Sequence, residues 1–347
     1  MKKPSIFVVL LTLQMPLLVM ATELVSIPAS SAAGAANTFP ELSSITPVKW
    51  RVDAQTQGAG TPNSLGLGIF WPIAIKDSST LFFDAVVNAN FSDFSGYSSI
   101  INTDVAGITA STSTRLGYRW FNQDGSWMFG ANAGYDTRSL KSGGDDTKVF
   151  IDDQLTVRYQ QVALGAEAIS TTWGVNAYAL LPIGNKEQRL NSAYNSGALT
   201  TYGADVGYRI LPNLRASLGY YYQRNNLELV NGSGARTSVT YDLTNDLAIG
   251  ANVSRDQAFQ TRFSISLQYS FGKFGAVSAQ QVDMFEPLRN RDIRVHDDFR
   301  STPDSKLLQE VQQSAQTEKG KPHDPVADAL QRAKIEAAIN TGAVKTP

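Results

Sequence analysis

The chain has 347 residues, of which 42% are hydrophobic and 18% are charged, and its formal net charge at pH 7 is -1. A charge so close to neutral gives no argument for nucleic acid or for a strongly acidic partner. The absence of Cys excludes disulfides, thiolate metal ligands and lipid attachment through a cysteine, and it suits an oxidising compartment.

Residues 1–21 predict a secretory signal peptide, because two lysines precede an apolar run that ends in small residues. A membrane-anchoring helix is the alternative. However, Gln14 and Pro16 interrupt the run, which is shorter than the roughly 20 residues that a helical span requires. A second stretch of small residues at 28–36 leaves cleavage as late as residue 36 open. We expect 22–45 to be a periplasmic N-terminal linker.

Between residues 46 and 272 the chain repeats one pattern, a segment in which every second side chain is apolar. The first segment, VKWRVDAQTQ at 48–57, places Trp50 on one face and Arg51 and Asp53 on the other. A period of two predicts β-strands with one apolar and one polar face. The expected strands cover residues 48–57, 65–75, 81–91, 115–121, 127–135, 162–168, 173–183, 202–210, 214–223, 235–243, 247–255 and 262–271.

Three properties of these segments favour a membrane barrel over a soluble sandwich, whose strands also alternate. Their length suits a tilted strand that crosses a bilayer, which needs about 9 to 11 residues. Aromatic residues gather at their ends, as interfacial girdles require, and the polar face is rich in Gly, Asn, Asp and Arg. We therefore predict an all-β fold, a twelve-stranded antiparallel transmembrane outer-membrane β-barrel. It is closed because an open edge would leave backbone groups unpaired in lipid.

This fold implies a location in the cell outer membrane. The expected partners are outer-membrane lipid and, during biogenesis, the secretion and barrel-assembly machinery. An even number of strands places both ends of the barrel in the periplasm.

The polar face of the strands predicts a charged lumen. Unpaired charges near low-dielectric walls are costly, so we expect the basic and acidic side chains of this face to pair with one another rather than leave a clear pore. The expected network comprises Arg51, Asp53, Asp84, Arg115, Arg119, Asp136, Arg138, Glu167, Asp205 and Arg209. The opposite face should contact lipid; it includes Leu67, Val87, Phe129 and Leu267.

The hairpin LGYRWFNQDGSWMFGANAGYDTR at 116–138 resembles the signature hairpin of the inverse autotransporter β-domain family, the barrels of intimins and invasins. The stretch QQVALGAEAISTTWGVNAYALLPIG at 160–184 is similar to two further strands of that family, and the resemblance extends over residues 46–295. The hairpin residues that carry it are Tyr118, Arg119, Trp120, Phe121, Trp127, Gly130, Asn132, Tyr135 and Asp136. The resemblance implies a membrane anchor that translocates and displays its own C-terminal segment.

The resemblance also bears on the chain after the last strand. VDMFEPLRNRDIRVHDDF at 282–299 is similar to a charged motif that follows the barrel in the family. This implies that residues 273–300 form a linker that runs back through the lumen, where Arg289, Arg291 and Arg294 would meet the lumenal carboxylates. A solvated periplasmic tail is the alternative reading of the same residues.

Residues 301–347 are expected to form a short, mostly irregular tail with one helix candidate, PVADALQRAKIEAAI at 325–339. The sequence shows no immunoglobulin-like array after the barrel, so adhesion is the part of the family's activity that it supports least. It does not specify a cell-surface or cell-wall partner for the tail.

The inventory of catalytic groups argues against an enzyme. Barrel hydrolases generally use a His as a base near neutral pH, but His296 and His323 both follow the last strand. The motifs GxSxG, HExxH and the P-loop are absent, and GGDD at 143–146 is typical of a solvated acidic turn, so we expect no metal and no cofactor. Two functions stay open, because an interior of twelve strands permits either. One is a display anchor with an occupied lumen; the other is a passive channel or structural barrel with a periplasmic tail.

Overall fold

The computed structural model describes the barrel region and two short segments after it. No helix in this described part is long and apolar enough to cross a membrane. The expected signal peptide, N-terminal linker and C-terminal tail lie outside the described residues. Those residues are 48–76, 78–142, 155–225, 230–271, 282–289 and 292–299.

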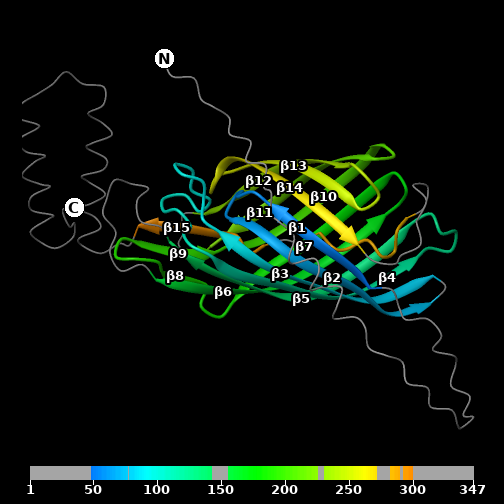
Figure 1. Cartoon of the computed structure of the whole chain (residues 1–347), viewed down its shortest axis with the longest axis horizontal. Helices are drawn as coiled ribbons and strands as arrows, with labels where there is room; N and C mark the ends of the chain where they lie inside the picture. The colour runs from blue at the N-terminus through cyan, green and yellow to red at the C-terminus, as the bar shows by residue number, and fades with distance from the viewer. Residues whose placement is uncertain are drawn as a thin grey trace, which may run out of the picture. The chain divides into compact units, whose positions relative to one another are not determined.

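Twelve antiparallel strands close into one barrel, in which the first strand pairs with the last (Figure 1). The closing pair runs from Trp50 opposite Phe271 to Gln55 opposite Ser266. The predicted all-β, twelve-stranded outer-membrane barrel fold is confirmed. The barrel strands are β1 (Lys49–Gln55), β2 (Asn63–Lys76), β3 (Ser79–Phe91), β4 (Thr109–Phe121), β5 (Met128–Lys141), β6 (Thr156–Ile169), β7 (Trp173–Ile183), β10 (Thr200–Leu211), β11 (Leu214–Arg224), β12 (Asn231–Asp242), β13 (Leu247–Asp256) and β14 (Gln260–Phe271).

Several strands extend beyond the sequence pattern, and the longest extensions at a strand start are those of β4 and β6. β4 begins at residue 109 rather than 115, and β6 begins at residue 156 rather than 162. The added stretches, TASTST and TVRYQQ, carry mostly Thr, Arg and Gln on the outward face, so the apolar alternation is missing there. Pairing with β5 holds both stretches in the sheet. The pattern therefore stops where the lipid-facing band stops, although the strand continues.

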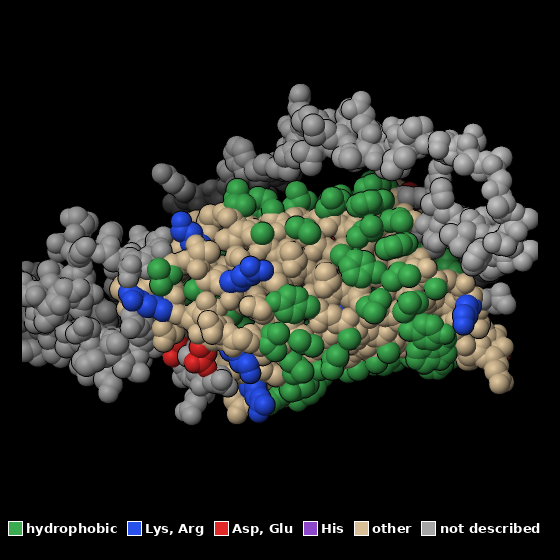
Figure 2. All heavy atoms as spheres, turned by 90° about the horizontal axis from the view of Figure 1, so that it is seen from below, with side chains coloured by type: hydrophobic (Ala, Val, Ile, Leu, Met, Phe, Trp, Pro, Cys, Tyr) green, Lys and Arg blue, Asp and Glu red, His purple; other side chains and the backbone are tan. Residues whose placement is uncertain are grey.

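The outward face of the barrel is apolar. Leu67, Val87, Phe129 and Leu267 expose 52%, 58%, 36% and 40% of their surface, as expected of side chains that face lipid. Figure 2 shows apolar side chains gathered over a broad band of the barrel wall. An aromatic girdle of the kind found at membrane interfaces lies at one end of the band. It comprises Trp50, Trp71, Tyr118, Trp120, Trp173, Tyr208, Tyr241 and Tyr269.

The two ends of the barrel differ in their connections. At one end, next to the aromatic girdle, the strands are joined by short turns such as 122–127 and 243–246; β1 begins and β14 ends there. At the other end the connections include the longer segments 92–108 and 184–199. We name these ends the short-turn mouth and the long-connection mouth. In outer-membrane barrels short turns are periplasmic and longer loops are extracellular.

A three-stranded sheet that the sequence pattern did not predict lies at the long-connection mouth, in the order β15-β9-β8 (Figure 1). β8 (Glu187–Arg189) and β9 (Tyr194–Ala198) belong to the connection between β7 and β10, whereas β15 (Val295–Phe299) follows the barrel. The post-barrel linker expected over residues 273–300 thus contains one strand. Its sequence, VHDDF, has no apolar alternation, so pairing with β9 and not a local pattern decides its structure.

Two neighbouring residues of β14 test the assignment of the two faces. Ile265 points outward and is 42% exposed, whereas Ser266 lines the interior. We expect Ile265→Arg to destabilise the barrel by about 2 to 4 kcal/mol because the charge would lie in lipid, and Ser266→Arg to cost far less. Denaturant unfolding in lipid vesicles measures both. Equal losses would show that the faces are wrongly assigned.

Candidate functional site

Ion pairs cover the inner face of the first barrel strands. The Arg51 guanidinium donates to both carboxylate oxygens of Asp84, at 2.6 and 2.8 Å, and its Nε donates to Asp53 at 2.9 Å. Gly68 lies opposite Arg51, and a Cβ at that position would come within 2.8 Å of the arginine side chain. The glycine on β2 therefore lets the arginine of β1 reach the carboxylate of β3.

Two further pairs continue this arrangement towards β6. Arg115 binds both oxygens of Asp136, at 2.5 and 3.0 Å, and Arg119 Nε donates to Glu167 at 2.6 Å. All four side chains are buried. Buried charges are tolerated when they are paired with good hydrogen-bond geometry. The wall from β1 to β6 is thus filled by side chains that fix one another.

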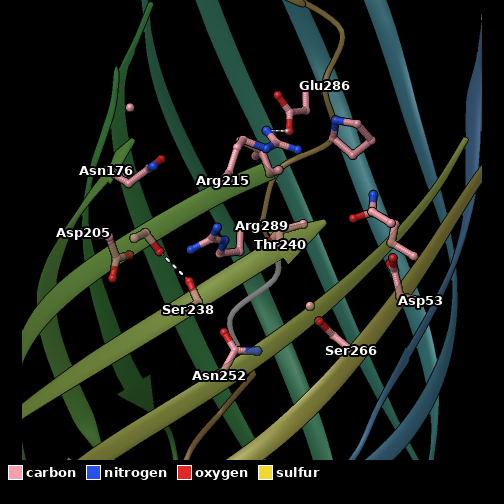
Figure 3. A pocket seen from close by; sticks show the side chains of 18 of the residues that line it. Asp53, Asn176, Asp205, Arg215, Ser238, Thr240, Asn252, Ser266, Glu286 and Arg289 are labelled. Atoms are coloured by element: carbon pink, nitrogen blue, oxygen red, sulfur yellow. Dashed lines mark hydrogen bonds and ion pairs between the residues drawn. The ribbon is translucent and has the colours of Figure 1, made fainter. Parts of the chain in front are cut away.

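The inner face of β7 and of β10 to β14 instead borders a cavity of about 960 Å³ (Figure 3). Asp205 on this face accepts two hydrogen bonds from Arg236 Nη2, at 2.7 and 2.9 Å. The cavity lining extends to the short turns 170–172 and 243–246. Small hydroxyl and amide side chains line it, among them Asn176, Ser238, Thr240, Asn252 and Ser266.

Residues 282–289 lie against the inner wall at the short-turn mouth. Arg119 Nη1 donates to the carbonyl oxygens of Met284 and Glu286, at 2.8 and 2.6 Å. The Glu286 carboxylate accepts a hydrogen bond from Arg215 Nη1 at 2.8 Å (Figure 3). The chain after the barrel is therefore held through both its main chain and a carboxylate.

Arg119 is fixed by its own neighbours before it meets this segment. Its guanidinium lies over the rings of Phe70 and Phe82, 5.5 and 4.9 Å from their centroids. The Glu167 carboxylate holds its Nε. Cation–π contact and ion pairing together pre-set the direction in which the remaining N–H groups point.

The segment continues along the wall towards the long-connection mouth. Gln55 Nε2 donates to the Asp292 carboxylate at 2.6 Å, and Arg138 Nη1 donates to the Ile293 carbonyl at 2.6 Å. Both wall residues lie near the ends of their strands at this mouth. The same Arg138 nitrogen also donates to the Gly60 carbonyl, so it joins the connection after β1 to the segment.

Arg294 makes a dense set of contacts. Its guanidinium lies over the rings of Tyr221 and Phe259, 4.7 and 5.0 Å from their centroids. Nη2 donates to Asp256 at 3.0 Å and Nη1 donates to Gln223 at 2.7 Å. The Asp256 side chain is 0% exposed, so water does not screen this ion pair. Arg294 therefore anchors the segment to β11 and β13.

β15 completes the path at the long-connection mouth. One edge pairs with β9, and on the other edge Asp297 N donates to the Ile100 carbonyl at 3.3 Å. The Asp297 carboxylate accepts hydrogen bonds from the backbone of Asn102 at 3.0 Å and from the backbone and hydroxyl of Thr103 at 2.8 Å. This carboxyl lies outside the membrane-spanning strands. Burial outweighs its hydrogen bonds and raises the pKa of Asp297 to about 7.

Two apolar clusters pack the long-connection mouth. The larger comprises Ile100, Val105, Leu140, Val157, Tyr159, Leu190, Ala193, Tyr194, Ala198, Ile293 and Val295. The smaller comprises Leu199, Val230, Ala258 and Phe259. Apolar side chains therefore fill the long-connection mouth, whereas the polar cavity extends to the turns of the short-turn mouth.

The residues expected in the lumen all take inward positions, but they do not all find the expected kind of partner. Arg138 meets carbonyl oxygens, and Arg209 lines the cavity. Asp205 pairs with Arg236, which the expected set lacks. The apolar alternation of β12 places Arg236 on the polar face, so the sequence does contain the information that locates it.

The expected linker arginines have three different outcomes. Arg289 lines the cavity, Arg294 pairs with Asp256, and Arg291 lies outside the described residues. Asp256 comes directly after the expected strand 247–255 and continues its polar face. Extending the strand by one residue would therefore have placed this carboxylate in the lumen. Phe259 lies between two strands, where no periodic pattern indicates an aromatic contact with Arg294.

The hairpin that carries the family resemblance divides between the two faces of the wall. Its outward members are Tyr118, Trp120 and Tyr135; its inward members are Arg119, Gly130, Asn132 and Asp136; those flanking the turn are Phe121 and Trp127. A Cβ at Gly130 would lie 2.5 Å from Glu167 Oε1. Glycine there leaves room for the carboxylate that holds Arg119.

No family model matches the chain, and no curated protein matches it in sequence. A chain solved in work on the in-meso crystallization of membrane proteins is 13% identical, with a TM-score of 0.51, over 73% of this chain and 100% of that chain. An outer-membrane channel from Pseudomonas putida F1 is 14% identical, with a TM-score of 0.43, over 70% and 100%. An active-site variant of outer-membrane phospholipase A from Escherichia coli is 11% identical, with a TM-score of 0.36, over 67% and 94%.

These likenesses concern the fold alone. The closed barrel, its apolar band and its aromatic girdle make the chain an outer-membrane β-barrel protein.

The ion pair of Arg294 and Asp256 tests how the segment is anchored. We expect Asp256→Ala to destabilise the protein by about 3 to 5 kcal/mol, because it leaves the Arg294 guanidinium, whose side chain is only 13% exposed, without its counter-charge. The control is Asp242→Ala: this carboxylate is 32% exposed and lies 3.6 Å from Arg215, so its loss should cost about 0 to 1 kcal/mol. Guanidinium unfolding in detergent measures both. A small loss in each would contradict the anchoring role.

Proposed function

We propose that the chain is an outer-membrane anchor of inverse-autotransporter type, which carries its own C-terminal segment through the barrel and displays it. The observation that carries this proposal is the path of the described residues after β14. Glu286 is bound at the short-turn mouth, and β15 pairs with β9 at the long-connection mouth. With short turns in the periplasm, this path leads from the periplasm to the cell surface.

The way the segment is held supports the proposal over a solvated periplasmic tail. Ile293 and Val295 are 1% and 0% exposed, and wall residues contact the segment at both mouths. An extended chain rises about 3.3 Å per residue, so about 8 residues cross a lipid band about 25 Å tall. The stretch 282–299 is longer than that.

The resemblance of the hairpin 116–138 to the inverse autotransporter barrels supports the same function. We limit the proposal to anchoring and display, and we assign no adhesive partner. We also propose no catalysis. His296 packs edge to face against Phe259 with ring centroids 5.6 Å apart, and burial lowers the pKa of His296 to about 4, so it is a poor base near neutral pH.

A passive channel is the second candidate, and the cavity of about 960 Å³ favours it. Its hydroxyl and amide lining suits a hydrated solute. In this case the segment would act as a plug, and conduction would require the apolar packing at the long-connection mouth to separate.

Conductance separates the two candidates. The full-length protein in a planar bilayer should show low conductance if the segment and the apolar clusters occupy the lumen permanently. Stable, large and unselective openings would favour the channel over the display anchor.

Cysteine labelling on intact cells tests orientation, because the chain has no native Cys. Ser95 lies exposed in a long connection and Asp124 lies exposed in a short turn. A membrane-impermeant maleimide should label Ser95→Cys directly, but Asp124→Cys only after the outer membrane is opened. An epitope tag after Pro347 should bind antibody on intact cells. If Ser95→Cys is labelled while the tag stays hidden, the orientation holds and the display proposal fails.

A further inference from the structure

The outward charges of the barrel strands are all of one sign in the part of the chain that the structure describes. The carboxylates of these strands, such as Asp84 and Asp136, have inward positions, where they pair with arginine. The outward charged residues are Lys76, Lys141, Arg158, Arg224 and Arg255. All except Lys76 lie at strand ends next to the long-connection mouth, and Figure 2 shows Lys and Arg side chains beyond the apolar band.

Three cations on this rim form a patch. Lys141 lies opposite Thr156, so Arg158 is its diagonal neighbour on the adjacent strand; side chains at such positions are about 7 to 8 Å apart at the backbone. Lys186 lies in the connection before β8. Gln188 fastens this connection to β6 by donating to the Arg158 carbonyl at 2.6 Å. The side chains of all three cations are exposed.

No acidic side chain among the described residues forms an ion pair with the patch. Among the described residues, no ion pair or side-chain hydrogen bond involves the charged groups of Lys141, Arg158 or Lys186, and the exposed carboxylate beside them is Glu187. The aspartates of the segment 143–154 lie outside the described residues, and the experiment below includes the outcome expected if they bind the patch.

The patch lies at the level expected of lipid headgroups. Tyr135 on β5 is outward and 39% exposed, and tyrosine rings of this kind mark the membrane interface. It pairs with Val162, four residues along β6 from Arg158. At about 3.3 Å per residue, less the strand tilt, the backbone of Arg158 lies roughly 10 Å beyond that of Tyr135, where phosphates and not acyl chains are expected.

We infer that Lys141, Arg158 and Lys186 bind the phosphate groups of an anionic lipid in the leaflet next to the long-connection mouth. The guanidinium fork of Arg158 matches two phosphate oxygens, and the lysines add point charges. A lipid is favoured over free phosphate because the patch adjoins the apolar band, so that one molecule can place its headgroup on the cations and its acyl chains on the wall. The inference holds whether the lumen displays a segment or conducts.

Native mass spectrometry of the full-length protein tests this inference, with diphosphorylated lipid A and phosphatidylglycerol as probes and phosphatidylcholine as the neutral reference. We expect the triple variant Lys141→Gln, Arg158→Gln, Lys186→Gln to retain the two anionic lipids at least tenfold more weakly than the native chain. Lys76→Gln, which removes an outward cation at the opposite mouth, should retain them as the native chain does. Retention of phosphatidylcholine should change in neither.

Three outcomes would overturn the inference. Unchanged retention in the triple variant would mean that the cations serve another partner, such as the aspartates of 143–154. Equal weakening in Lys76→Gln would mean that binding is not local. Displacement of the lipid by inorganic phosphate at comparable concentration would mean that the site takes a free anion. Heat-modifiable migration on gels verifies folding, and the single variant Arg158→Gln replaces the triple one if the latter does not fold.

Discussion

In hydrocarbon, a backbone N–H or C=O without a partner costs several kcal/mol, and the rest of this structure follows from that constraint. It requires β1 to pair with β14, because any open edge would face lipid. Closure in turn decides which side chains point inward. Once arginines and carboxylates share a confined interior, they must pair or remain hydrated, so Arg51 holds Asp84 and Arg115 holds Asp136.

The inward charges of the barrel are paired on one part of the wall and border a polar cavity on the other. From β1 to β6, long charged side chains cover the wall and fix one another, which leaves arginines with rigid, directed N–H groups. From β10 to β14 many of the inward side chains are short and polar, and space remains beside the post-barrel segment. One half of the wall therefore holds the segment with buried arginines such as Arg119, while the other half binds it through Arg215 and Asp256 and leaves a cavity beside it.

The sequence predicted the barrel because apolar alternation records contact with lipid, and every barrel strand has that contact. The same reasoning explains where prediction failed. The first residues of β4 and β6 lie beyond the lipid, and β15 does not contact it, so none of these stretches shows the pattern. In the lumen, the alternation of side chains along a strand predicted which residues face inward but not which groups they bind. Arg138 shares its face with Arg115, yet it binds carbonyl groups from the connection after β1 and from a segment more than a hundred positions away.

Arg119 and Arg138 hold the post-barrel segment by its carbonyl oxygens and not by its side chains. Every residue carries a carbonyl oxygen, so replacing Met284 or Ile293 alters the side-chain packing but leaves the acceptor of the hydrogen bond in place. These two arginines therefore bind the main chain of the segment, and their hydrogen bonds do not depend on which side chains it carries. At these two positions the wall can stay constant while the enclosed sequence changes, whereas Arg215 and Asp256 still require a carboxylate and an arginine opposite them.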